Sequence, residues 1–194
     1  MNVAASYTLF DTAIGRCAIA WRGGLVISTA LPGADDEATL RHLLRRAPQG
    51  SEAEPNEVAA DAIDLVRRLL GGEAVDLSVI PVDLAACPDF ERRIYERLRE
   101  VPTGSTVTYG ELATRAGAPG AARAVGMAMG RNPVPIIIPC HRVLASSGGS
   151  GGFSAPGGVT TKFQILQIEQ AGRSGDGSLL FDDLPLAVRN PTLS

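Results

Sequence analysis

The sequence predicts an α/β N-terminal domain, a small antiparallel sheet with helices, followed by a mostly α C-terminal domain that contains a helix-turn-helix. Three observations predict this fold class. Short alternating or apolar runs come first, amphipathic helical periods follow them, and two helices joined by a glycine-rich turn lie further along the chain. We therefore expect domains at residues 1–85 and 86–172 and a C-terminal tail at 173–194.

The N-terminal domain is expected to begin with a hairpin, because Ser6–Phe10 and Arg16–Trp21 flank a turn that ends at Gly15. The other segments are predicted, in order, as a third strand, an amphipathic helix, a surface loop, a second amphipathic helix and a strand that Pro81 confines to an edge. These segments are Gly24–Ala30, Glu37–Arg46, 47–55, Glu57–Leu70 and Asp76–Val82.

The C-terminal domain is expected to be helical around a buried apolar stretch, Ile136–Ile138. Thr108 has the position and chemistry of an N-cap for the helix that follows it. A helix, a turn containing glycine and a second helix are typical of a helix-turn-helix, although many helical hairpins share that pattern. The predicted helices are Asp89–Glu100, Tyr109–Arg115, Ala121–Met129 and Lys162–Gln170.

Composition and charge place few limits on function. The net charge is −3, with a balance of −5 over residues 1–85 and +3 over 86–172, so attraction to phosphates would belong to the second segment. Three cysteines do not make a disulfide framework, and we expect a reducing cytoplasm. No membrane-length apolar run and no paired metal-ligand motif occur, so we expect no membrane association, no metal and no cofactor.

The reactive centre is predicted at Cys140, in the run Ile138–Val143. Most unpaired cysteines are structural, and Cys17 and Cys87 fit that description. Cys140 differs because His141 and Arg142 follow it directly, and such neighbours favour the nucleophilic thiolate. His141 can act as the base, directly or through a water. Glu169 on the closing helix is the candidate to orient the imidazole, although spacing alone would fit an exposed carboxylate.

These residues belong to a pattern that resembles the O6-alkylguanine-DNA alkyltransferases, also called methylated-DNA–protein-cysteine methyltransferases. The resemblance runs from Phe90 to Glu169, and its most specific part is Asn132–Val143. Thr108–Leu112 and Ala121–Gly126 lie at the family's spacing upstream. The first 85 residues resemble the family's variable N-terminal domain only loosely.

The resemblance implies a function: direct reversal of DNA damage, in which a flipped O6-alkylguanine gives its alkyl group irreversibly to Cys140. Asn132 would tie the active-site turn to the helix-turn-helix, and the Tyr109 hydroxyl would meet N3 of the guanine. Arg123 would replace the extruded nucleotide in the base stack. Further DNA contacts are implied for Ala121, Ala122, Gly126 and Thr108, and pocket positions for Tyr109, Met129, Val143, Phe153 and Ser154.

The chain departs from the family pattern at a few positions. Ile94-Tyr95 stands where Val-Trp is usual, a place we expect in the core. Phe153 replaces a common tyrosine, and an insertion at Ala155-Pro156 lengthens the loop that walls the pocket. The range of alkyl groups accepted therefore stays open at this point.

Two other functions fit parts of the sequence. A protein that binds alkyl lesions without transfer is the main alternative, although such proteins carry another residue in place of the reactive cysteine. A thiol hydrolase using Cys140, His141 and Glu169 would leave the helix-turn-helix unexplained. Double-stranded DNA carrying O6-alkylguanine is the expected partner, O4-alkylthymine is a further substrate to consider, and a monomer is expected.

Overall fold

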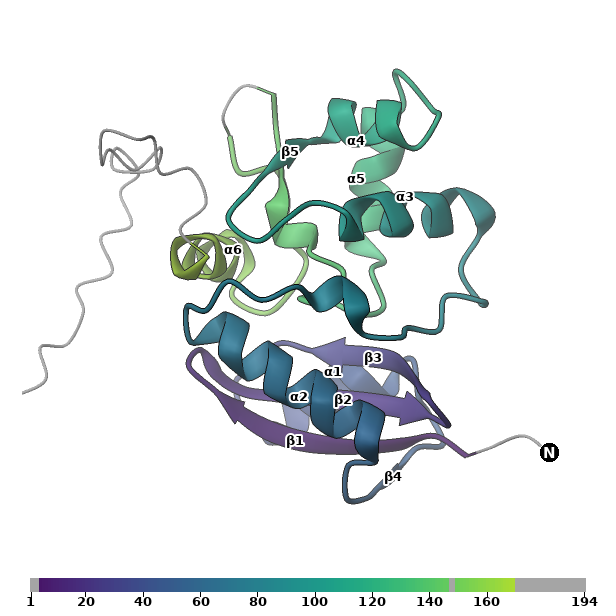
Figure 1. Ribbon diagram of the computed structural model, residues 1–194, viewed down its shortest axis with the longest axis vertical. Helices are drawn as coiled ribbons and strands as arrows, with labels where there is room; N and C mark the ends of the chain where they lie inside the picture. The colour runs from purple at the N-terminus through teal and green to yellow at the C-terminus, as the bar shows by residue number, and fades with distance from the viewer. Residues whose placement is uncertain (1–3, 147–148, 170–194) are drawn as a thin grey trace, which may run out of the picture.

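The computed structural model of the chain describes residues 4–146 and 149–169 (Figure 1). Its first half contains a four-stranded sheet in the order β3-β2-β1-β4. The strands are β1 (Ser6–Thr12), β2 (Gly15–Arg22), β3 (Leu25–Ala30) and β4 (Ser51–Glu52). The first three are antiparallel as predicted, but β4 runs parallel to β1, so the sheet is mixed. The segment predicted as a loop at 47–55 supplies β4 because Ser51 donates to the Ala5 carbonyl (3.1 Å) at the free edge of β1.

Two helices cover opposite faces of this sheet, α1 (Asp36–Leu44) and α2 (Glu57–Leu70) (Figure 1). Successive side chains of β2 point to alternate faces, as in any strand. Ile19 and Trp21 join the large core cluster that includes α2, whereas Ala18 and Ala20 join a smaller cluster with Leu43 of α1. The small residues on the α1 face let that helix approach the sheet closely.

The strand predicted at Asp76–Val82 is absent from this described segment and the prediction was wrong. The chain instead forms a 3₁₀ turn, η1 (Leu77–Val79), because the Asp76 carboxylate accepts from the backbone N–H of Ser78 at 2.8 Å. Such a local side-chain bond competes with strand pairing. Only Val82 retains a single bridge, to Val26 of β3.

The second half is mainly helical, and most of its predicted helices are present. Its elements are α3 (Asp89–Arg99), β5 (Val107–Thr108), α4 (Tyr109–Arg115), α5 (Ala122–Gly130), η2 (Cys140–Arg142), β6 (Val143–Leu144) and α6 (Gly158–Ile168). The last helix begins four residues before the predicted Lys162, because Gly157 takes a left-handed conformation that starts it. Gln170 and the predicted tail at 173–194 lie outside the described residues.

The two halves share one hydrophobic cluster, which runs from Trp21 and Val66 to Leu112 and Ile138. Ile94 and Tyr95 are fully buried in it, which confirms the expectation that this pair belongs to the core. The Tyr95 hydroxyl donates to the Ala128 carbonyl at 2.8 Å and so finds a partner inside α5. The cluster crosses residue 85, and the division into independent domains there stays a prediction. No helix in the described part of the chain is long and apolar enough to span a membrane.

Candidate active site

A proline-pinned turn between α5 and η2 presents Cys140. Asn132 holds this turn together: its amide donates to the Ile138 carbonyl (2.8 Å) while its oxygen accepts from Val134 N–H (3.0 Å). Ile136 adopts a φ of 74°, an unusual conformation for a β-branched residue, and it is buried. The turn is thus over-determined by its hydrogen bonds and packing, and it fixes where the Cys140 side chain begins.

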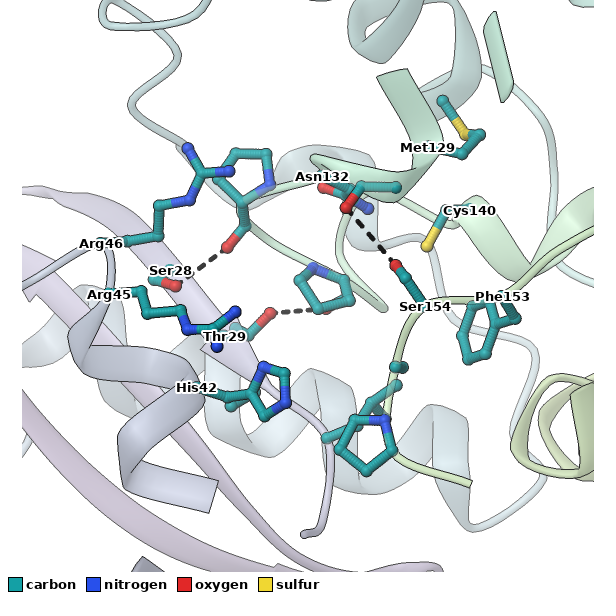
Figure 2. A pocket seen from close by; sticks show the side chains of 17 residues that line it. Ser28, Thr29, His42, Arg45, Arg46, Met129, Asn132, Cys140, Phe153 and Ser154 are labelled. Carbon is teal, nitrogen blue, oxygen red and sulfur yellow. Dashed lines mark hydrogen bonds between the residues drawn. The ribbon is translucent and has the colours of Figure 1, made fainter. Parts of the chain in front are cut away.

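Strand β3 supports the same turn from the other half of the molecule. The Ser28 hydroxyl donates to the Pro133 carbonyl at 2.9 Å, and the Thr29 hydroxyl donates to the Pro135 carbonyl at 2.6 Å. Figure 2 shows both bonds beside the cavity. The N-terminal sheet therefore helps to position the turn that carries Cys140.

Cys140 is buried, and its sulfur faces a cavity of about 210 Å³ between the two halves (Figure 2). Burial raises the pKa of the Cys140 thiol, while the Asn132 side chain and the charge of Lys162 act to lower it. The net direction is upward, so the resting thiol is protonated and a base is needed to form the thiolate. On the Cys140 side the cavity is lined by Met129, Asn132, Phe153 and Ser154, and on the far side by Ser28, Thr29, His42, Arg45 and Arg46.

His141 and Arg142, which follow Cys140 in the chain, form a buried network with Glu169. His141 Nε2 lies 3.0 Å from Glu169 Oε1. Arg142 grips the same carboxylate with two N–H groups, Nε to Oε2 at 2.9 Å and Nη2 to Oε1 at 2.8 Å. Burial alone would raise the pKa of the Glu169 carboxyl, but hydrogen bonds and charge from His141 and Arg142 outweigh it and lower that pKa to about 2. Glu169 is therefore a carboxylate at neutral pH.

This network assigns the tautomer of His141. Burial lowers the pKa of His141, although Glu169 opposes that effect, and the imidazole is neutral at pH 7. A neutral imidazole carries a single N–H, and a carboxylate can only accept. The hydrogen therefore lies on Nε2, facing Glu169. Nδ1 keeps its lone pair and is buried without a hydrogen-bond partner among the described residues, so it is free to accept a proton.

Tyr109 lies at the start of α4, in a second cavity of about 500 Å³ that also reaches Cys140. Its hydroxyl lies 3.4 Å from the Gly152 carbonyl, to which it donates. Burial, and secondarily Cys140, raises the pKa of Tyr109, so the phenol keeps its proton. The cavity is further lined by Ala122, Arg123, Gly126, Met129, Gly130, Phe153 and Ser154.

Helices α4 and α5 pack against each other beside this second cavity. Thr108 caps α4 as predicted: its hydroxyl accepts from Glu111 N–H at 3.2 Å, and the Glu111 carboxylate accepts from Thr108 N–H at 2.7 Å. Arg123 is exposed, and Ala121, Ala122 and Gly126 are partly exposed around it. The face of α5 beside the second cavity therefore carries small residues and one arginine.

Of the five predicted pocket residues, Tyr109, Met129, Phe153 and Ser154 line a cavity that reaches Cys140, and Val143 is the exception. Among the predicted DNA contacts, Thr108 and Ala121 line neither cavity. Val143 lines neither cavity that reaches Cys140. It is fully buried in β6, and its carbonyl accepts from Lys162 Nζ at 2.5 Å, so it forms part of the support behind the pocket wall. Ser154 lines both cavities, and its hydroxyl contacts the Gly130 carbonyl at 3.4 Å (Figure 2).

Sequence reasoning missed the roles of Arg142 and Lys162. In the sequence Arg142 is only a cationic neighbour of Cys140, whereas in the structure it also donates to the Val101 carbonyl (2.6 Å) and to Thr103 Oγ1 (3.1 Å). One signal did exist for Lys162, since it is the only lysine in the chain. In the part of the chain that the structure covers, no three His, Cys, Asp or Glu side chains gather as a metal site would require.

Comparison with known proteins identifies relatives of this arrangement. The family model described as 6-O-methylguanine DNA methyltransferase, DNA binding domain, matches residues 89–171. The methylated-DNA–protein-cysteine methyltransferase of Methanothermobacter thermautotrophicus is 35% identical, over 77% of this chain and 84% of the relative. That of Mycobacterium bovis is 34% identical, over 89% of this chain and 97% of the relative.

Solved structures agree with these relatives. The crystal structure of Mycobacterium tuberculosis OGT in complex with DNA is 33% identical, covers 91% of this chain and 99% of that one, and gives a TM-score of 0.70. The O6-methylguanine-DNA methyltransferase of Pyrococcus kodakaraensis is 29% identical, with coverage of 85% and 98% and a TM-score of 0.63. The similarity extends over both halves of the molecule.

Proposed function

Because this chain belongs to the methylated-DNA–protein-cysteine methyltransferase family, we propose that Cys140 is its alkyl acceptor and that O6-alkylguanine in double-stranded DNA is its substrate. The activity of the chain is that of the family, repair of methylated DNA by direct reversal. The assignment of individual residues to steps of this reaction rests on the geometry of the site.

The observation that carries the mechanism is the bond of 3.0 Å between His141 Nε2 and Glu169 Oε1, which leaves Nδ1 as the acceptor. His141 takes the thiol proton of Cys140, directly or through a water, as the sulfur attacks the alkyl carbon. A C–S bond forms, the C–O6 bond breaks, and its electron pair stays on the guanine. The guanine anion takes up one proton and His141 releases the one that it accepted, so the proton count balances and the reaction needs no cofactor.

Tyr109 assists the departure of the guanine. As negative charge develops on the base, a phenol that keeps its proton can donate a hydrogen bond to N3 and stabilise that charge. Asn132 positions the nucleophile by holding its turn. Met129, Phe153 and Ser154 wall the space between Tyr109 and Cys140 and enclose the flipped base.

The helices α4 and α5 act as a helix-turn-helix on DNA. Ala121, Ala122 and Gly126 present little bulk, which suits the narrow minor groove. Arg123 is exposed at the mouth of the guanine cavity, and its planar guanidinium can stack in the place of the extruded base. Thr108, at the start of α4, adds a contact near the backbone. Flipping the base costs a few kcal/mol, which these contacts offset.

The thioether that forms on Cys140 is not reversed by hydrolysis or by disulfide exchange, so the alkyl group stays on the protein. Each chain therefore reacts once, and we propose that it does so as a monomer, with its DNA contacts in residues 86–172. Sedimentation of the protein alone and with a short duplex tests the monomer, and a dimer in both would contradict it.

A mass measurement tests the proposed acceptor. The protein is incubated with excess duplex containing O6-methylguanine or O6-benzylguanine and is then digested. The peptide bearing Cys140 should gain one CH₂ or one benzyl substituent in place of the thiol hydrogen. Tight binding of the lesion duplex with an unmodified Cys140 would favour the lesion-binding alternative, and modification of Cys17 or Cys87 would contradict the assignment.

A further inference from the structure

The single lysine of this chain lies buried behind the active site. The sequence carries 18 basic residues of the Lys and Arg type, and all of them except Lys162 are arginine. Lys162 projects from α6 and is completely inaccessible to solvent. Burying a lysine is strongly unfavourable unless its charge has partners. The chain therefore has arginine at all its other Lys or Arg positions, but it has an ammonium at this fully buried one.

The partners of Lys162 are parts of the pocket wall. Its Nζ donates to the Val143 carbonyl at 2.5 Å and to the Ser150 carbonyl at 2.6 Å. Val143 follows the segment of Cys140, and Ser150 precedes the segment that passes over Tyr109. The ammonium thus joins the strand behind the nucleophile to the loop that closes the guanine cavity.

Two groups of the proposed reaction lie within its electrostatic reach. Lys162 Nζ is 6.0 Å from the centre of the Tyr109 ring, a distance at which a cation still interacts with an aromatic face. The positive charge of Lys162 also acts on Cys140, where it lowers the pKa of the thiol against the larger effect of burial. In the described part of the chain, Lys162 is thus the cation that acts on both Cys140 and Tyr109.

On the basis of the function proposed above, we propose that Lys162 is a positioning residue for alkyl transfer, whose ammonium holds the pocket wall against β6 and stabilises the thiolate of Cys140. Lysine suits this place better than arginine. Its ammonium is compact and directs three donors from one atom, whereas a guanidinium is a planar fork that needs a wider space. Two carbonyl oxygens within 2.6 Å of one nitrogen describe such a compact site.

This role makes the reaction sensitive to pH. Burial lowers the pKa of Lys162 to about 8, although Cys140 acts in the opposite direction. The charged and titratable groups that act near it are Cys140 and His141 of η2 and Tyr109 of α4. The ammonium is present below pH 8 and is lost as the pH rises through 8, so the transfer rate should fall on the alkaline side.

Three variants separate charge from structure: Lys162→Met keeps the length without charge, Lys162→Gln keeps N–H donors without charge, and Lys162→Arg keeps the charge to higher pH. The single-turnover rate of methyl transfer is measured from pH 6 to pH 10, together with lesion-DNA affinity and Tm. For Lys162→Met and Lys162→Gln we expect a rate at least about tenfold lower at pH 7. The alkaline fall in rate should be absent from both variants, because they carry no ammonium that can lose its proton.

The wild-type protein should show a falling limb near pH 8, and Lys162→Arg should move it to higher pH while restoring part of the neutral rate. DNA affinity should stay within about twofold in all variants, since Lys162 is remote from solvent. If Lys162→Met lowers Tm and rate but leaves the shape of the pH profile unchanged, Lys162 is only a structural residue and the proposal is wrong. An unmodified Cys140 in the wild-type protein would instead contradict the proposed function itself.

Discussion

Glu169 is the residue on which the charge balance of the site depends. Its fully buried carboxylate accepts from His141 and from two N–H groups of Arg142. Removing one member of such a network leaves a buried charge without a partner, which costs far more than the network contributes as a whole. The same carboxylate fixes the imidazole tautomer, so one side chain serves stability and, in the proposed mechanism, proton transfer.

Replacing Glu169 by Gln should affect both properties. We expect a loss of about 3–5 kcal/mol in the free energy of unfolding, because Arg142 remains buried and charged. The transfer rate should fall by about 100-fold, since the amide no longer enforces a proton on Nε2. Urea unfolding and single-turnover kinetics measure the two effects. Glu96→Gln is a matched control, because that glutamate is exposed on α3; equal losses in both variants would contradict the network.

The depressed pKa of Glu169 also predicts how stability depends on pH. The folded-state pKa of about 2 lies below the ordinary value of 4.5. The stabilisation is therefore present above pH 4.5 and is lost as the pH falls toward 2, by about 3 kcal/mol in total. Unfolding free energies measured across this window should decline less in Glu169→Gln than in the wild-type protein. A parallel decline in both would show that other carboxyls dominate.

At the scale of elements, the wall of the second cavity, between Tyr109 and Cys140, depends on a glycine. Gly151 has a φ of +63°, and a Cβ there would lie 2.5 Å from the Tyr109 hydroxyl oxygen. Only a residue without a side chain lets this segment pass so close to the ring. The segment and α4 therefore define the space left for the base between Tyr109 and Phe153.

The substitution Gly151→Ala should displace this wall. Because the added methyl cannot share space with the Tyr109 hydroxyl, we expect the transfer rate to fall by about 10- to 100-fold through misplacement of the base. Gly72→Ala is the control, since Gly72 also has a positive φ but meets nothing within 4 Å. Comparable rates for the two variants would show that this segment can shift to accommodate the methyl group, which would contradict the prediction.

The elements differ in how well their sequence predicts them. Helix α4 matches its predicted bounds because Thr108 and Glu111 form a capping box that needs only local residues. The strand predicted at Asp76–Val82 was wrong because the residue types there do not reveal the turn that the Asp76 carboxylate stabilises. Strand β4 was missed because its two residues pair with β1 only after α1 has brought the chain back to that edge.

For the molecule as a whole, the sheet of the first half takes part in the site of the second. Ser28 and Thr29 of β3 donate to carbonyls of the turn before Cys140, more than 100 residues away in the chain. The two halves also share one apolar cluster. A substitution in β3 should therefore change how the turn positions Cys140.

Thr29→Val tests this coupling. The variant leaves the Pro135 carbonyl without its donor, so the free energy of unfolding should drop by about 1–3 kcal/mol. The transfer rate should fall by several-fold while DNA affinity is retained, because the turn loses its support. Thr8→Val in β1 is the control, as its hydroxyl makes only a long bond of 3.4 Å to the neighbouring carbonyl. An unchanged rate in Thr29→Val would mean that the second half positions Cys140 unaided.

Hydrogen bonds between residues far apart in the chain are the part of the site that the sequence does not predict. The chemistry of a nucleophile, its base and an orienting group suggested His141 with Glu169, and the structure places their side chains 3.0 Å apart. The remaining bonds of Arg142 depend on how the chain after α3 packs beside α6, and no local pattern reports that packing. The same holds for Lys162, whose carbonyl partners are 12 and 19 residues away.

The central claim is that Cys140 is consumed by a single transfer, and counting transferred groups tests it most directly. Protein is mixed with an excess of duplex carrying an isotopically labelled O6-methyl group, and label on the protein is followed to completion. We predict a plateau at one methyl per chain, all of it on Cys140, and none in Cys140→Ser. Release of label beyond one equivalent, or a full plateau in Cys140→Ser, would contradict this account.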